Sequence, residues 1–132
     1  MFSHITLGTN DVQKATAFYG TVLGLLGYEL KFSEAHWAGW KQPDADRPLF
    51  IVTTPQDGQP ASAGNGSMVA LATASRDLVD RLHAKALALG ARCEGPPGLR
   101  PQYHAAYYGA YFRDPDGNKL CVCCHLAPDS QS

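Results

Sequence analysis

The chain has 132 residues, 45 % of them apolar and 17 % charged, which suits one globular domain and excludes a disordered protein. Eleven basic and twelve acidic residues give a net charge of −1, so nucleic acid and a membrane surface are not expected partners. The N-terminal residues lack a signal-peptide pattern, and no apolar run is long enough to span a bilayer. We therefore expect a cytoplasmic protein with reduced thiols at Cys93, Cys121, Cys123 and Cys124.

An internal repeat is the main organising feature of the sequence. Residues 68–73 (MVALAT) resemble residues 4–9 (HITLGT), and both runs predict a strand with apolar side chains at alternate positions. A helical pattern follows each strand. The first is expected to open at Asn10, with Gln13 in the capping-box position, and the second at Ser75. Glycines 27 and 90 are expected to end the two helices.

The apolar residues of the second helix predict which of its faces is buried. That stripe leaves His83 on the exposed side, and His36 is also expected to be exposed. The stripe consists of Leu78, Leu82, Ala86 and Leu89.

Three shorter strands are expected after each helix. They cover residues 28–32, 36–41 and 49–54 in the first half, and 91–94, 107–113 and 119–124 in the second. A proline-rich loop is predicted at 95–102, and the Asp114–Asn118 segment (DPDGN) predicts a tight turn before the last strand.

The predicted fold class is α+β, with two tandem β-α-β-β-β units forming a curved mixed sheet around a shared cleft. A single domain over residues 1–132 would consist of unit 1–54, linker 55–66, unit 67–126 and tail 127–132. If each helix covers one face of its sheet, small or polar residues remain on the other face. Such a roomy concave face is the default place for a ligand. The residues left on that face are His4, Thr6, Gly8, Met68, Ala70 and Ala72.

These features resemble a known family. The β-α-β-β-β duplication, the opening HITL at 4–7, the AFY at 17–19, the LG at 23–24 and the FRDPDGNKL at 112–120 are similar to the vicinal oxygen chelate superfamily. That superfamily includes glyoxalases, bleomycin-resistance proteins and extradiol dioxygenases. The resemblance covers residues 2–126 and implies a homodimer that binds a small molecule.

The resemblance also implies metal ligands on the first and last strands of each unit. The four positions here are His4, Ile51, Met68 and Cys121. His4 suits a metal ion, Cys121 offers a thiolate, and the other two do not suit a hard or borderline divalent ion. We therefore expect a glyoxalase-like protein that binds a small organic molecule with a degenerate metal site. Two alternatives stay open. One is a metal-dependent lactoylglutathione-lyase-like enzyme or dioxygenase that uses His4 and Cys121 with Zn²⁺, Ni²⁺, Mn²⁺ or Fe²⁺. The other is a non-enzymatic, resistance-type binding protein.

Further candidate ligand-binding residues come from the residue types themselves. Trp40 and Tyr108 are candidates to stack on a flat ligand, and Arg100 is a candidate partner for a carboxylate or phosphate. Cys121 and Cys123 share one strand face and with His4 would form a soft Zn²⁺ site. The alternatives are that these cysteines are buried apolar residues, or that a positive neighbour lowers the pKa of Cys121 and makes it reactive.

Overall fold

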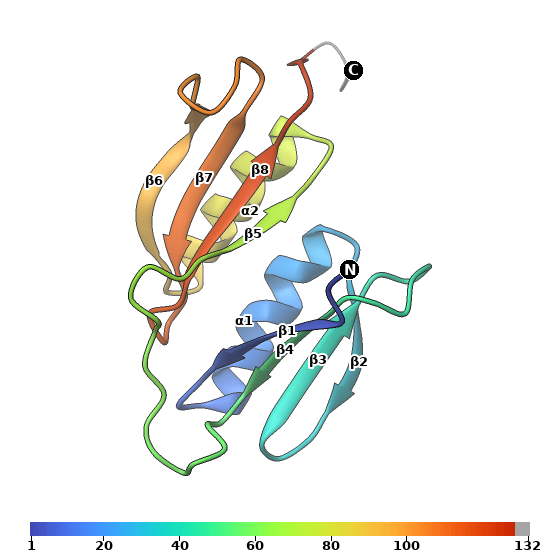
Figure 1. Cartoon of the computed structure of the whole chain (residues 1–132), viewed down its shortest axis with the longest axis vertical. Helices are drawn as coiled ribbons and strands as arrows, with labels where there is room; N and C mark the ends of the chain where they lie inside the picture. Colours follow the sequence, from blue (N-terminus) through green and yellow to red (C-terminus); the bar gives the residue numbers. More distant parts are fainter. Residues whose placement is uncertain (129–132) are drawn as a thin grey trace. The chain divides into compact units, whose positions relative to one another are not determined.

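The computed structural model describes residues 1–128, so part of the predicted tail at 127–132 lies outside the described residues. The chain divides into two compact units, one ending at Ala63 and the next beginning at Gly64. Each unit holds one helix and one four-stranded sheet (Figure 1). Within residues 1–128, neither helix is long and apolar enough to cross a membrane.

The first unit has the predicted β-α-β-β-β order. Its sheet has the order β1-β4-β3-β2, with β1 parallel to β4 and the other neighbours antiparallel. The elements are β1 (His4–Gly8), α1 (Val12–Leu25), β2 (Glu29–Ser33), β3 (Trp37–Lys41) and β4 (Leu49–Thr53).

The second unit repeats this order. Its sheet has the order β5-β8-β7-β6, with β5 parallel to β8. The elements are β5 (Val69–Ala72), α2 (Arg76–Ala88), β6 (Arg92–Leu99), β7 (Tyr108–Arg113) and β8 (Lys119–Cys124). Both sheets are mixed and open, which confirms the α+β fold class and the tandem repeat.

Strand alternation separates a helix-facing side from an open side in each sheet. In the first unit, the Tyr19 ring of α1 packs against Phe50 at 4.9 Å and Trp40 at 6.3 Å between ring centroids. In the second unit, Val79 and Leu82 of α2 and Phe112 of β7 are fully buried. Each helix therefore covers one face of its own sheet, and the opposite face has no helix of that unit packed on it.

The first helix begins one residue later than predicted. Its N-cap is Asp11, whose Oδ1 accepts from the backbone N–H of Lys14 at 3.0 Å. Asn10 instead bonds to the backbone of Ala61, donating to its carbonyl at 3.1 Å and accepting from its N–H at 2.7 Å. This long-range contact removes Asn10 from capping. Ser75 caps α2 as predicted, by accepting from the N–H of Leu78.

The expected exposure of His83 is wrong. The buried stripe of α2 is rotated and consists of Val79, Leu82, His83 and Ala86, whereas Leu89 is 37 % exposed. The imidazole packs edge-on against Phe112, with 6.4 Å between ring centroids. His83 lies four residues after Val79 and so occupies the same helix face. His36 is exposed as expected.

The predicted loop at 95–102 is largely a strand. β6 continues to Leu99 through Pro96 and Pro97, with irregular register between Cys93 and Gly95 and between Gly95 and Gly98. β6 lies at the edge of its sheet, where a proline's missing N–H breaks no ladder on the outer side.

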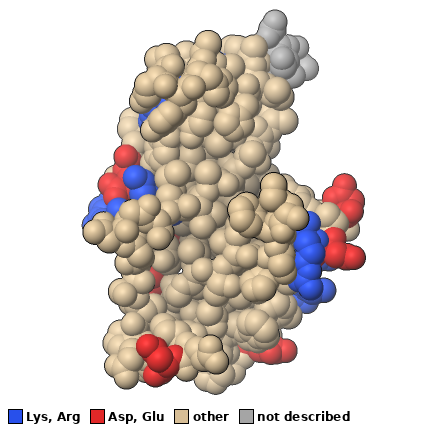
Figure 2. Space-filling view, in the orientation of Figure 1, with Lys and Arg blue, Asp and Glu red and all other residues tan. Residues whose placement is uncertain are grey.

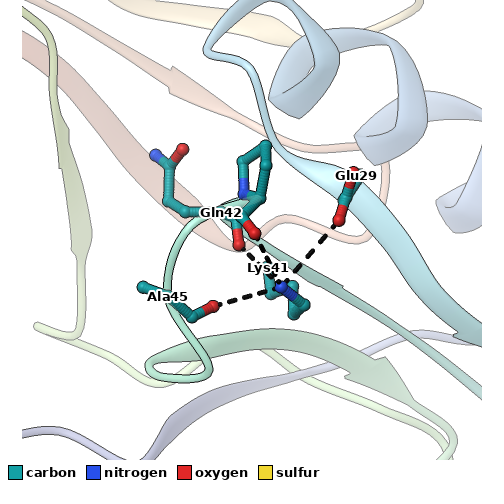
Figure 3. Close-up of polar contacts among 5 residues, drawn as sticks. Glu29, Lys41, Gln42 and Ala45 are labelled. Atoms are coloured by element: carbon teal, nitrogen blue, oxygen red, sulfur yellow. Dashed lines mark hydrogen bonds and ion pairs between the residues drawn. The ribbon is translucent and has the colours of Figure 1, made fainter.

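The ammonium group of Lys41 holds the segment that follows β3 through hydrogen bonds to backbone carbonyls. The Lys41 ammonium donates to the carbonyls of Gln42 at 2.9 Å, Ala45 at 3.3 Å and Pro43 at 3.4 Å, and lies 3.8 Å from Glu29 (Figure 3). On the face drawn in Figure 2, basic and acidic groups lie beside each other and leave a mostly uncharged surface. No broad basic patch is visible on that face of the described residues, in line with the net charge.

The predicted turn at 114–118 is built around one buried carboxylate. Asp114 accepts from the backbone N–H groups of Asp116 and Asn118, both at 2.9 Å, and from the Asn118 side-chain amide at 3.0 Å. Gly117 has a φ of 91°, which favours glycine. The turn fixes where β8 begins.

Candidate functional site

The open side of the second sheet carries the densest group of chemically active side chains. Along β8, Leu120, Val122 and Cys124 alternate with Lys119, Cys121 and Cys123. In the antiparallel register Tyr111 of β7 lies directly opposite Cys121, so the two share a face. This face of β8 and β7 is opposite to the one that packs on α2.

Two phenol groups meet the Cys121 thiol. The hydroxyl oxygen of Tyr107 lies 3.4 Å from Cys121 Sγ and 3.0 Å from the hydroxyl oxygen of Tyr111. Gly109 makes this possible, because a Cβ at that position would lie only 2.8 Å from Cε1 of Tyr107. The Tyr107 ring thus lies flat over a glycine and covers Cys121, which is fully buried.

The hydrogen bonds around Cys121 favour its thiolate. A hydrogen bond from the Cys123 thiol lowers the pKa of Cys121 to about 7, against the opposing effect of burial. Tyr107, Tyr111 and the positive charge of Arg100 contribute in the same direction. The same thiol–thiol hydrogen bond raises the pKa of Cys123. A lowered pKa is a property of nucleophilic cysteines, whereas the complete burial of Cys121 is a property of structural ones.

A histidine pair connects the thiols to the surface. His125 Nε2 lies 3.7 Å from Cys123 Sγ, and His125 Nδ1 lies 2.9 Å from His104 Nε2. The two imidazoles are stacked, with 5.1 Å between centroids and 23° between planes. Both histidines are exposed, so a line of polar contacts runs from buried Cys123 to solvent.

A hollow of about 500 Å³ lies on this side of the second unit. We call it the tyrosine hollow, and it is lined by Met68, Tyr103, His104, Tyr107, Tyr111, Lys119 and His125. Tyr103 is 62 % exposed and Met68 is 44 % exposed. Because Tyr107 and Tyr111 both line this hollow and contact the Cys121 cluster, Cys121 lies immediately beneath its wall.

The first unit has a hollow of its own, of about 590 Å³. His4, Thr6 and Ile51 from β1 and β4 line it together with His36 and Trp37. His4 Nδ1 lies 2.9 Å from the Ser3 hydroxyl. The open side of β1 is therefore the accessible one, as the alternation predicts.

Two predicted aromatic site residues lie on the helix-facing side instead. Trp40 is 2 % exposed and packs in the core against Tyr19. Tyr108 donates a hydrogen bond to Asp80 of α2 at 2.6 Å. Burial, followed by the hydrogen bond to Asp80, raises the pKa of Tyr108 to about 12. Each of these side chains occupies a strand position that alternation turns toward the helix. The tryptophan that lines a hollow is Trp37, at a position of the opposite orientation in β3.

Arg100 also has internal partners. Its guanidinium donates to the Pro96 carbonyl at 2.7 Å and lies over the Tyr111 ring, 5.5 Å from the centroid. It therefore sits beside the tyrosine hollow and is hydrogen-bonded to the backbone of β6.

Tyr107, Tyr111, His104 and His125 were not singled out by the sequence reasoning. The parity of Tyr111 and His125 with Cys121 is the signal that would have found those two.

The donor set does not fit the family's divalent metal. The four positions carry an imidazole, an alkyl group, a thioether and a thiol that is covered by Tyr107. Mn²⁺ prefers carboxylate and carbonyl oxygens, imidazole suits Ni²⁺, Fe²⁺ and Zn²⁺, and a thiolate suits Zn²⁺, so of the four positions only His4 and Cys121 offer these ions a ligand. Among residues 1–128, no group of three or more His, Cys, Asp or Glu side chains is placed to hold a metal ion. His4 and Cys121 belong to different units.

Comparison with known proteins agrees with this fold. The family model for the glyoxalase/bleomycin resistance protein/dioxygenase superfamily matches residues 1–122. The chain belongs to this superfamily. A glyoxalase/bleomycin resistance protein from Albidiferax ferrireducens T118 is 39 % identical, with a TM-score of 0.83, over 96 % of this chain and 99 % of that one.

More distant members of the glyoxalase superfamily share the fold alone. A lactoylglutathione lyase from Agrobacterium tumefaciens is 22 % identical, with a TM-score of 0.66, over 93 % of this chain and 92 % of that one. A glyoxalase/bleomycin resistance protein/dioxygenase family enzyme from Burkholderia phytofirmans PsJN is 20 % identical, with a TM-score of 0.72, over 94 % and 98 % of the chains. No curated protein sequence matches the chain.

Proposed function

We propose that this glyoxalase-superfamily protein binds a small, flat, largely apolar organic molecule in the tyrosine hollow, without the family's divalent metal. The observation that carries the proposal is the aromatic lining of that hollow, where Tyr103 and Met68 remain exposed beside Tyr107 and Tyr111. A volume of about 500 Å³ suits a compact organic molecule.

The ring geometry supports a stacked ligand. Tyr103 and Tyr107 meet edge to face, with 5.0 Å between centroids and 62° between planes. A flat molecule placed against Tyr103 gains offset or edge contacts with both rings, each worth about 0.5–1.5 kcal/mol beyond the area buried. Lys119 and His125 supply polar groups that orient the ligand at the rim.

The donor chemistry supports a binding protein over the metal-dependent alternatives. A lactoylglutathione-lyase-like or dioxygenase reaction needs a metal that activates adjacent oxygens, and the residues at the four family positions do not suit it. A binding protein of the resistance type needs only the hollow. We therefore place binding first and metal-dependent catalysis second.

A ligand-observed NMR screen of small aromatic ketones and phenols tests the proposal. In a protein-observed titration of each compound that binds, we expect the methyl resonance of Met68 to shift and the affinity to weaken about five-fold on Tyr103→Ala, the loss of one ring contact. The matched control is Leu30→Ala in the first unit, where the side chain is 52 % exposed and lines none of the hollows described above. Equal weakening by both variants, or shifts confined to the hollow of the first unit, would contradict the proposal.

A further inference from the structure

The buried thiol of Cys121 has no task in the binding of a ligand, yet the structure surrounds it with groups that suit covalent chemistry. Its sulfur lies 3.4 Å from the Tyr107 hydroxyl, which in turn lies 3.0 Å from the Tyr111 hydroxyl. On the helix-facing side of the same strand, Cys124 makes a long contact of 3.9 Å with the Leu126 carbonyl. Cys121 is therefore the thiol of this strand that contacts a phenol hydroxyl and lies behind the wall of a hollow.

The Tyr107 side chain contacts Cys121 and also lines the tyrosine hollow. The Tyr107 ring makes edge contacts with Tyr103 and His125, at 5.0 and 5.4 Å between centroids, and its hydroxyl is held by two side chains. Residues 101–106, just before Tyr107, form turns rather than a strand or helix. Access to the sulfur from this hollow therefore requires the Tyr107 ring to move.

Two cationic side chains lie next to the tyrosine hollow, over the ring of Tyr111. Lys119 Nζ lies over the Tyr111 ring, 5.7 Å from its centroid, and Lys119 lines the tyrosine hollow. Arg100 lies over the same ring at 5.5 Å. A positive charge and two phenol hydroxyls are suited to stabilise negative charge that develops on a carbonyl oxygen.

We propose that Cys121 is a nucleophile that adds to α,β-unsaturated carbonyl compounds held in the tyrosine hollow. Sulfur is a soft nucleophile, and the conjugated carbonyl is a flat, soft electrophile that suits the aromatic walls. The proposal rests on the binding function above and names its ligand class.

The chemical step is an addition. The Cys121 sulfur forms a bond to the β-carbon, and the carbon–carbon π pair moves to the α-carbon and carbonyl oxygen as an enolate. Lys119 stabilises that enolate, and the proton that the thiol has given up ends on the α-carbon. No group leaves, and nothing is oxidised or reduced. The product is a thioether that holds the compound on the protein.

The test treats the folded, wild-type chain with cyclohex-2-en-1-one and maps the adduct by peptide mass spectrometry. Cys93 is exposed and serves as the internal reference. We expect Cys121 to be modified faster than Cys93 although it is covered, Cys124→Ala to leave this rate unchanged, and Cys121→Ala to remove the adduct. Modification of Cys93 alone, or of Cys121 only after unfolding in urea, overturns the proposal.

Two further arms separate covalent chemistry from binding. Saturated cyclohexanone binds without reacting, so NMR shifts at Met68 with the ketone but no enone adduct refute the covalent step alone. Absence of both refutes the covalent step and the proposed binding together. Lys119→Met should slow the addition about five-fold beyond any loss of ketone affinity, because its charge acts on the developing enolate. Lys31→Met, on the exposed strand β2, is the matched control, and an equal effect of both variants contradicts the role of Lys119.

Discussion

Replacing Asp114 with alanine tests how strongly the turn before β8 holds the second unit. The carboxylate accepts three hydrogen bonds, two from backbone N–H groups and one from the Asn118 amide, and Asp114 is only 5 % exposed. Hydrogen bonds to a charged acceptor contribute about 1.5–3 kcal/mol each, but donors that regain water lose less. The Asn118 donors are buried, whereas Asp116 is half-buried. We therefore expect Asp114→Ala to lower the free energy of unfolding by about 3 kcal/mol.

Urea unfolding followed by far-UV circular dichroism measures this change, with hydrogen exchange of the β7 and β8 amides to locate it. Asp114→Asn keeps one carbonyl acceptor and should lose about half as much. The matched control is Asp44→Ala, an exposed aspartate in the turn before β4, with an expected change within about 0.5 kcal/mol. A loss below about 1 kcal/mol for Asp114→Ala would show that the turn is held mainly by Gly117 and the backbone.

Three further predictions concern the buried His83, the Tyr107 ring that covers Cys121, and the turn held by Lys41. Burial lowers the pKa of His83 below its unfolded value of 6.5, so the unfolded chain takes up a proton more readily. The stability that comes from neutral His83 is complete above pH 6.5 and is lost as pH falls below it. Urea midpoints at pH 7.5 and 5.5 should differ less in His83→Gln than in wild type, and an unchanged difference contradicts this. Gly109→Ala places a Cβ 2.8 Å from Tyr107 Cε1 and should displace that ring, so that a disulfide reagent titrates Cys121 as well as exposed Cys93 in the folded protein. A titre equal to that of wild type would mean that the ring adapts. Lys41→Met leaves three carbonyls without their ammonium donor and should cost about 1–2 kcal/mol in urea unfolding, whereas Lys31→Met should cost less than about 0.5.

The fold could be predicted because its signals are local. Alternation, glycine helix ends and the DPDGN turn each depend on a few neighbouring residues, and the repetition of the pattern in the second half of the chain predicted the order of elements. The wrong predictions, of the first helix's N-cap and of the extent of β6, arise where residues far apart in the sequence form hydrogen bonds that local patterns do not show. Asn10 is drawn from capping by Ala61, 51 residues away, and β6 extends through its prolines because Gly98 and Leu99 pair with Gly109 and Tyr108.

The candidate site was harder to predict for a related reason. Sequence reasoning found Cys121 but selected Tyr108, whose parity faces α2, rather than Tyr111, which lies opposite Cys121. Tyr107 precedes β7 and reaches Cys121 only by folding across Gly109, which strand periodicity does not encode. His104 stacks on His125 from 21 residues away, so their pairing required the β7–β8 register.

The prolines of β6 have a consequence for the behaviour of the protein at high concentration. An edge strand normally offers a row of free N–H and C=O groups on which another chain can add a strand. Pro96 and Pro97 offer no N–H, and the irregular register around Gly95 and Gly98 disturbs the spacing of the groups that remain. Strand addition to this border of the sheet is therefore disfavoured. The bent segment that seats Arg100 above Tyr111 also protects the second unit from edge-to-edge aggregation.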